Sequence, residues 1–307
     1  MTSAINKTMS RQDLLTEEAQ PVIRDLNALV HAMYARGLYM SSWVGTLPWR
    51  SGPGKRSQIS RLLSGIKGRL SGKRPGNAEA EALRNGMEQR LEYQALPDAA
   101  DDLRLPWFLY WEIYWLIKVA GPSLHKGMRV LDGGGTMSLF SCYLASLGFE
   151  VHAVDLKANL RDYGMKVART MGWPMFSYVM DLQALEFPDA YFDHAFSVCV
   201  FEHLNFETRQ KTLAEVARCL KSGGILGITF DYRNPAPGIV GYGKDTRPEN
   251  RLSTLEDIAR NFSSNPQLEI IGNGRFYDNG ESYLAHHRFD HTPYTFGALF
   301  LRKKGVQ

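Results

Sequence analysis

A glycine turn between two acidic residues carries the clearest chemical signal in the chain. Asp132 is followed by Gly133, Gly134 and Gly135, and Asp155 stands 23 residues after Asp132. Three glycines let a backbone turn sharply, and the N–H groups at the start of a following helix face a ligand bound above the turn. An acid about 20 residues further on accepts hydrogen bonds from the hydroxyls of a ribose. The spacing therefore predicts a nucleoside site.

The position of Asp132 in front of the glycines distinguishes two kinds of nucleoside cofactor. A carboxylate at a strand tip repels the pyrophosphate of a dinucleotide but attracts a ligand that carries an ammonium and a sulfonium. S-adenosylmethionine carries both groups, so we expect it to be the cofactor. An NAD-dependent oxidoreductase is a third hypothesis, which this charge opposes. Two roles stay open for Asp132, namely binding the methionine ammonium directly and fixing the glycine turn.

Alternating strand and helix patterns predict the elements that hold these acids. Val130 and Leu131 end a short apolar strand, and a second strand at 150–154 ends before Asp155. Further strands are predicted at 176–180, 194–200, 225–231, 268–271 and 294–301, with helices at 139–147, 206–220 and 255–262. This order predicts a doubly wound α/β fold with a mostly parallel, seven-stranded sheet and an antiparallel edge strand, because the last two strands have no helix between them.

The sequence from about residue 126 to residue 304 resembles class I S-adenosylmethionine-dependent methyltransferases of the small-molecule type, which have a Rossmann-like fold. Four segments carry the resemblance: LDGGGTMS at 131–138, VHAVDL at 151–156, MDL at 180–182 and FDHAFSVCVFEHL at 192–204. The family commonly has Asp-x-Gly-x-Gly-x-Gly, whereas Thr136 and Ser138 replace its second and third glycines here. We expect Ser138 to cap the helix that follows.

The resemblance implies a set of residues that bind S-adenosylmethionine. Asp155 accepts hydrogen bonds from the ribose hydroxyls, Asp181 accepts one from the adenine amine, and Leu182 packs on the adenine ring. The full set is Asp132, Gly133, Gly134, Gly135, Asp155, Leu156, Asp181 and Leu182. A second interpretation stays open for Asp155 and Asp181, because aspartate at the end of a strand also forms turns.

Glu202 and His203, after the fourth predicted strand, are the candidate catalytic residues. Methyl transfer from a sulfonium is an in-line displacement, so a protein mainly aligns the reacting atoms and removes a proton from a neutral oxygen or nitrogen acceptor. An imidazole with an ordinary pKa of about 6.5 suits this proton transfer. The alternative is that both residues only start the next helix. Asp231, Tyr232 and the loop 277–293 reach the same edge of the predicted sheet.

No metal site is expected. Cys142, Cys199 and Cys219 have no paired spacing, and we interpret them as small core residues in a reducing compartment. His287 and His291 have a spacing that can hold a metal on a helix, but nothing else in the sequence supplies an evident partner set. A solvated loop is the preferred interpretation of this pair.

The first 120 residues are predicted to form a helical N-terminal extension, and residues 121–307 the cofactor-binding domain. Helices are expected at 21–40, 78–94 and 105–119. The last of these is strongly aromatic. We interpret its stripe of Trp and Tyr residues as core, while Glu112 lies off the stripe and could reach a ligand.

A basic, glycine- and serine-rich segment at 50–76 is the second unusual feature. Residues 50–74 contain eight Lys and Arg and no Asp or Glu, whereas the net charge of the whole chain is +4. On an amphipathic helix these cations would bind an anionic membrane surface, but the glycines and prolines favour a solvated linker. The segment lacks aromatic residues that stack on bases, so nucleic acid is not an expected partner.

Together these features predict a cytoplasmic methyltransferase that acts on a small-molecule, lipid- or sugar-linked acceptor by in-line transfer. The cytoplasm is favoured because no signal peptide or membrane-spanning stretch is evident. One alternative is a peripheral membrane methyltransferase of a lipid or quinone, which the basic segment suggests. The other is a non-catalytic regulator that binds S-adenosylmethionine, suggested by the variant glycine turn.

Overall fold

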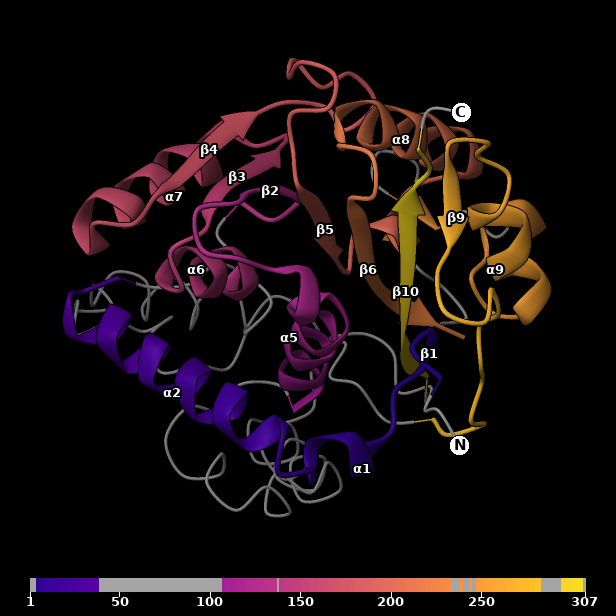
Figure 1. Ribbon diagram of the computed structural model, residues 1–307, viewed down its shortest axis with the longest axis horizontal. Coiled ribbons are helices and arrows are strands. Elements are labelled where there is room, and N and C mark those ends of the chain that lie inside the picture. The colour runs from indigo at the N-terminus through magenta and orange to yellow at the C-terminus, as the bar shows by residue number, and fades with distance from the viewer. Residues whose placement is uncertain are drawn as a thin grey trace, which may run out of the picture.

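A central eight-stranded sheet organises the residues that the computed structural model describes, which are 4–38, 107–136, 138–233, 238–239, 243–244, 247–282 and 294–305 (Figure 1). The strand order is β1-β10-β6-β5-β2-β3-β4, and β9 also pairs with β10. The bounds are β1 (Lys7–Thr8), β2 (Arg129–Gly133), β3 (Glu150–Asp155), β4 (Met175–Val179), β5 (His194–Val198), β6 (Ile225–Tyr232), β9 (Leu268–Ile270) and β10 (Thr295–Lys303). Two short strands, β7 (Gly238–Ile239) and β8 (Gly243–Lys244), form a separate sheet.

The order of the parallel strands creates a position where a ligand can bind. Strands β4, β3, β2, β5 and β6 run parallel to one another. From β2 the chain adds β3 and β4 on one side, and it then places β5 and β6 on the other. The strand order therefore reverses between β2 and β5. Open α/β sheets bind ligands at such a reversal, beyond the carboxyl ends of the strands.

Helices cover both faces of the sheet (Figure 1). One hydrophobic cluster joins the sheet to α2 (Ala19–Ala35), α5 (Trp107–Ala120), α6 (Leu139–Ser146) and α7 (Ala158–Met171), and the other joins it to α8 (Phe206–Cys219) and α9 (Leu255–Phe262). Val130 belongs to the first cluster and Leu131 to the second, as the alternation of side chains along a strand requires. The short helices are α1 (Arg11–Leu14), η3 (Gly121–Ser123), η4 (Phe201–His203) and η5 (Pro248–Asn250).

Helix α5 lies between the sheet and the N-terminal helices. The hydroxyl of Tyr110 donates to Oδ1 of Asn27 in α2 (2.5 Å), and Nε1 of Trp111 donates to Oδ2 of Asp13 in α1 (2.8 Å). Trp111 and Trp115 are fully buried, which confirms that this part of the aromatic stripe is core. Helix α5 also contacts β6 and β10. Its residue Glu112 lies next to Cys199, near the carboxyl end of β5.

The fold class predicted from the sequence is confirmed, with one addition. All seven predicted strands are present, and β9 and β10 pair antiparallel as expected. The eighth strand, β1, comes from the N-terminal extension and pairs antiparallel with β10. Two residues are too few for a periodic pattern to predict a strand. Instead, the side chain of Asn6 fixes β1 by accepting the N–H of Phe300 and donating to the carbonyl of Ile271.

Several predicted segments lie outside the described residues. These are the helix at 78–94, the basic segment at 50–76 and the loop that contains His287 and His291. The domain boundary at residue 120 stays a prediction. In the described ranges we find no helix with the length and apolarity needed to cross a bilayer.

Candidate cofactor and active site

The carboxyl ends of β2, β3 and β4 bring three predicted cofactor-binding segments together. Two hydrogen bonds continue the pairing beyond the strands. The N–H of Gly134 donates to the carbonyl of Val154 (2.9 Å), and the N–H of Met180 donates to the carbonyl of Asp155 (3.0 Å). The glycine turn, Asp155 and the segment 180–182 therefore adjoin one another, beside the reversal of strand order.

Asp132 lies beneath the glycine turn and is fully buried. Its Oδ2 accepts hydrogen bonds from Oγ of Ser138 (2.8 Å) and Oγ of Ser141 (2.6 Å), whereas Oδ1 has no partner in the described part of the chain. Burial raises the pKa of Asp132 to about 6, although both serine hydroxyls oppose the rise. Of the two roles left open by the sequence, these contacts support fixing the turn. Oδ1 keeps its acceptor capacity.

Each glycine of the turn touches a neighbour that leaves little room for a side chain. A Cβ at Gly134, where φ is +77°, would lie 2.4 Å from Cγ2 of Val200. A Cβ at Gly135 would lie 1.9 Å from Cγ of Asp132, and one at Gly133 would lie 3.1 Å from Leu182. A turn without side chains lets a ligand approach its backbone closely. Gly134 of the turn also packs directly on Val200, which follows Cys199 after the end of β5. This contact connects the glycine turn to the carboxyl end of β5.

Two polar residues take the places of glycines, and Ser138 forms side-chain hydrogen bonds there. Oγ of Ser138 accepts the N–H of Ser141 (2.9 Å) as the N-cap of α6, which confirms the predicted cap. Its hydroxyl also donates to Asp132, a bond that a glycine could not make. Thr136 is buried, and its Cγ2 lies 3.4 Å from the Cβ position of Gly164 in α7. In the described part of the variant turn, Ser138 therefore holds Asp132.

Asp155 and Asp181 both accept backbone hydrogen bonds from the residue two positions further on. Oδ1 of Asp155 accepts the N–H of Lys157 (3.1 Å), and Oδ1 of Asp181 accepts the N–H of Gln183 (2.9 Å). Asp155 is half-buried, and burial raises its pKa against the effect of Lys157. Each aspartate thus forms a turn, as the second interpretation predicted. A carboxylate has about four acceptor positions, so each also retains capacity for a ligand.

The apolar members of the predicted set lie on the same edge. Leu156, directly after Asp155, is 59% exposed. Leu182 packs against the position of Gly133. These two leucines offer apolar surface at the carboxyl ends of β3 and β4.

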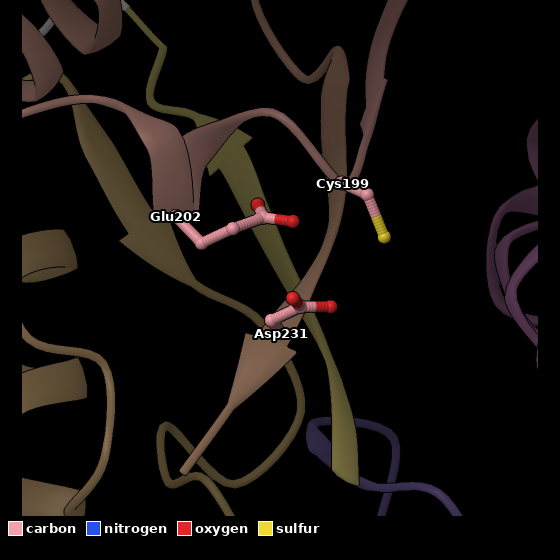
Figure 2. A group of neighbouring side chains, drawn as sticks. All are labelled: Cys199, Glu202 and Asp231. Carbon is pink, nitrogen blue, oxygen red and sulfur yellow. The ribbon is translucent and has the colours of Figure 1, made fainter. Parts of the chain in front are cut away.

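A buried group of acidic and thiol side chains lies where β5 and β6 end, and we call Cys199, Glu202 and Asp231 the acidic cluster (Figure 2). One ligand atom from each side chain lies within 4.8 Å of those of the other two. The three residues are 6%, 1% and 2% exposed. Cys199 has a φ of +51°, a left-handed conformation that costs a residue with a side chain about 1–3 kcal/mol.

Glu112 of α5 extends the acidic cluster. Sγ of Cys199 donates to Oε1 of Glu112 at 2.7 Å. Burial raises the pKa of Glu112 to about 7 and that of Glu202 to about 8, and the charge of a neighbouring carboxylate adds to each rise. Neither oxygen of Glu202 meets the geometry of a hydrogen bond to any described residue. Within the described ranges no Lys or Arg forms an ion pair with Glu112 or Glu202.

The nearest buried cation does not bond to the acidic cluster. Arg209 of α8 is fully buried, and its guanidinium donates to four other acceptors, which are the carbonyls of Phe201, Leu204 and Asn250 and the side chain of Asn261. Its role is to hold η4 and the segment after it. Glu202 therefore projects from a rigid element, and Arg209 interacts with it electrostatically without forming a hydrogen bond to it.

Helix η4 separates the two predicted catalytic residues by environment. Glu202 faces inward with 1% of its side chain exposed, whereas 26% of the side chain of His203 is exposed. Nε2 of His203 lies 3.9 Å from Oε1 of Glu202. Cys199 and its partner Glu112 had weaker sequence signals. Cys199 resembled a core cysteine, and only its position at a predicted strand end could have drawn attention to it. Glu112 was visible as the one acid in an aromatic helix.

A known protein family matches the part of the chain that holds these residues. Residues 131–228 match the family model of the methyltransferase domain. The matched stretch contains every predicted cofactor-binding residue together with Cys199, Glu202 and His203. No curated protein matches the sequence.

Many solved structures are similar to part of the chain. One is an S-adenosylmethionine-dependent methyltransferase from Methanosarcina mazei, which is 18% identical, with 61% of this chain and 97% of that chain covered and a TM-score of 0.48. Another is the YcgJ protein of Bacillus subtilis, which is 18% identical, with 64% of this chain and 100% of that chain covered and a TM-score of 0.47. A third is phosphoethanolamine N-methyltransferase 2 of Haemonchus contortus in complex with S-adenosylmethionine, which is 19% identical, with 63% and 52% covered and a TM-score of 0.46.

Proposed function

We propose that this chain, which is a class I S-adenosylmethionine-dependent methyltransferase by its domain at residues 131–228, methylates a small-molecule, lipid- or sugar-linked acceptor by in-line transfer. The observation that carries the proposal is the placement of Asp132, the glycine turn and Asp155 at the reversal of strand order. When bound, S-adenosylmethionine supplies an electrophilic methyl group on a sulfonium. The residues of the chain then bind and orient the cofactor and the acceptor, and they exclude water from the site.

The residues at the turn fit this cofactor chemically. Oδ1 of Asp132 is a buried acceptor without a partner among described residues, and a cationic group would compensate the charge that burial disfavours. Asp155 would hold the ribose hydroxyls, with Asp181 and the apolar side chains of Leu156 and Leu182 around the adenine. The same charges would disfavour a pyrophosphate.

The acidic side chains beside the cofactor site argue for the class of acceptor. Glu112, Glu202 and Asp231 lie at the ends of the strands next to the turn, on the side opposite Asp155. These carboxyls offer a polyanion such as nucleic acid no cationic partner. A neutral or cationic acceptor of small size is compatible with these charges. Removal of a proton from it would fall to His203, which is the more accessible of the predicted pair.

Calorimetry with S-adenosylmethionine and S-adenosylhomocysteine tests the proposal before any acceptor is known. We expect both ligands to bind the wild-type chain. S-adenosylhomocysteine should bind Asp155→Ala at least about tenfold more weakly than it binds the wild type, because a hydrogen bond to a charged group contributes about 1.5–3 kcal/mol. Asp162→Ala, an exposed acid on α7, is the matched control. Absence of heat with both ligands would refute the proposal. Binding without turnover of any acceptor would favour the non-catalytic regulator.

The basic segment at 50–74 supports a peripheral membrane form of the same enzyme as a second candidate. Each cation near an anionic leaflet contributes about 1 kcal/mol, so eight of them would suffice for binding. Co-sedimentation with phosphatidylserine vesicles, compared between the full chain and a chain that lacks residues 50–74, distinguishes the two forms. Equal sedimentation of both chains would remove the membrane candidate.

A further inference from the structure

We propose that Cys199, Glu202 and Asp231 bind a divalent transition metal ion, with Zn²⁺ as the ion that their donor atoms select. The sequence predicted no metal site, because the three cysteines have no paired spacing and the histidine pair at 287 and 291 has no evident partner set. The structure brings them together from the end of β5, from η4 and from the end of β6, so that the carboxylates of Glu202 and Asp231 lie near each other and near the Cys199 sulfur (Figure 2).

The distances suit one ion. Zn²⁺ binds cysteine sulfur at about 2.3 Å and carboxylate oxygen at about 2.0–2.2 Å. The donor atoms of the acidic cluster lie within 4.8 Å of one another, so small side-chain rotations close them around a single centre. A thiolate with two carboxylates favours zinc over magnesium or calcium, because those hard ions prefer oxygen ligands alone.

The buried oxygens of Glu202 point independently to a missing partner. Buried charges in proteins are paired or coordinate a metal. Glu202 is 1% exposed, and both of its oxygens lack a hydrogen-bond partner among the described residues, although its side chain is directed into the cluster. The nearby guanidinium of Arg209 is committed to other acceptors. An ion at the cluster would supply the partner that Glu202 lacks.

Glu112 would act on the ion through Cys199. It accepts the proton of the Cys199 thiol at 2.7 Å. A metal-bound thiolate has no such proton, so with the ion bound a protonated Glu112 would donate to Sγ instead. Residues in this outer position commonly fix the ligand that they contact. Three protein ligands leave a fourth position open, an arrangement found in catalytic rather than structural zinc sites. Since Val200 joins Cys199 to the glycine turn, that open position would lie beside the cofactor site.

Metal titration of the full chain, freed of metal by a chelator and without an affinity tag, tests the site. We expect one Co²⁺ per chain, with a thiolate-to-cobalt charge-transfer band in the near ultraviolet, and displacement of Co²⁺ by Zn²⁺. Cys199→Ser should abolish the band. Glu202→Gln should weaken Zn²⁺ binding at least about tenfold, because even the loss of an outer partner costs about 10–100-fold.

Matched controls separate this site from others. Cys219→Ser removes another buried cysteine, Glu186→Gln removes an exposed acid, and the double variant of His287 and His291 to Ala removes the histidine pair of the loop. All three should bind Co²⁺ as the wild type does. The inference is overturned if the wild type shows no thiolate band, if Cys199→Ser keeps it, or if a control variant loses it. The titration needs no cofactor, so its failure leaves the methyltransferase proposal intact, and calorimetry with S-adenosylhomocysteine tests that proposal separately.

Discussion

Replacement of Asp132 by asparagine should change how the stability of the protein depends on pH. Asp132 is fully buried, and its pKa is raised to about 6 from an ordinary value of 3.8. A group with a raised pKa holds its proton longer in the folded than in the unfolded chain. Its contribution to stability is therefore fully present below about pH 4 and is lost as pH rises through about 6.

The size of the effect follows from that difference in pKa. One pKa unit equals about 1.36 kcal/mol, so ionisation of Asp132 costs the folded protein about 3 kcal/mol over the whole range. Between pH 4.5 and 7.5 the cost grows by about 2 kcal/mol. The amide of the Asp132→Asn variant cannot ionise and still offers an oxygen to Ser138 and Ser141. Relative to the wild type, this variant should therefore gain about 2 kcal/mol in free energy of unfolding across this interval.

Urea unfolding of both proteins at several pH values measures this gain. The comparison cancels the titration of Glu112 and Glu202, because both proteins keep those residues. A fixed cost of the amide, such as an unpartnered N–H, shifts the variant equally at every pH and does not affect the slope. Parallel stability profiles of variant and wild type would refute the reasoning. They would show that Asp132 either ionises without penalty or meets a cation in the folded chain.

Three further predictions concern the turn and its surroundings. Asp155→Ala should reduce S-adenosylhomocysteine affinity at least about tenfold by calorimetry, with little change in melting temperature, because the Asp155 side chain supports only a local turn. Gly134→Ala should lower the free energy of unfolding by about 2 kcal/mol through its positive φ and its contact with Val200. Val200→Ala in that background should restore only the part of the free energy of unfolding that is lost through the contact with Val200. Arg209→Met should cost more than about 3 kcal/mol in urea unfolding, because it leaves several buried acceptors without a donor.

The sequence predicted the fold well because the sheet is built from long periodic segments. Strands β2 to β6 and helices α6, α8 and α9 appear where the pattern of apolar residues predicted them. Ser138 caps α6, as its side-chain chemistry predicts. Strand β1 could not be predicted, since two residues have no period and Asn6 fixes them through contacts with β10 and its neighbour. Local pattern thus determines the long strands and helices, whereas side-chain contacts across the fold determine that residues 7 and 8 pair with β10.

The candidate site divides in the same way. The cofactor half is local, because the turn follows β2 directly and each acid follows its own strand. The acidic cluster is assembled from distant parts of the chain, and Cys199 meets Glu112 across 87 positions through the packing of α5 on the sheet. No spacing rule connects such residues. What a sequence shows is single polar residues in apolar surroundings, of which Glu112 in its aromatic helix is the clearest.

One electrostatic feature connects both halves of the site. Asp132, Glu112 and Glu202 are buried carboxyls along one edge of the sheet, with pKa values raised to about 6, 7 and 8. Burial of this kind is unfavourable for the folded chain alone, and ordinary core residues would avoid it. It becomes favourable when cations bind, because each then gains an interaction in a medium of low dielectric constant. A sulfonium cofactor at Asp132 and a metal ion at Glu202 would each remove part of this unfavourable charge. The affinity of the site for cations therefore derives from the same burial that costs the unliganded protein stability.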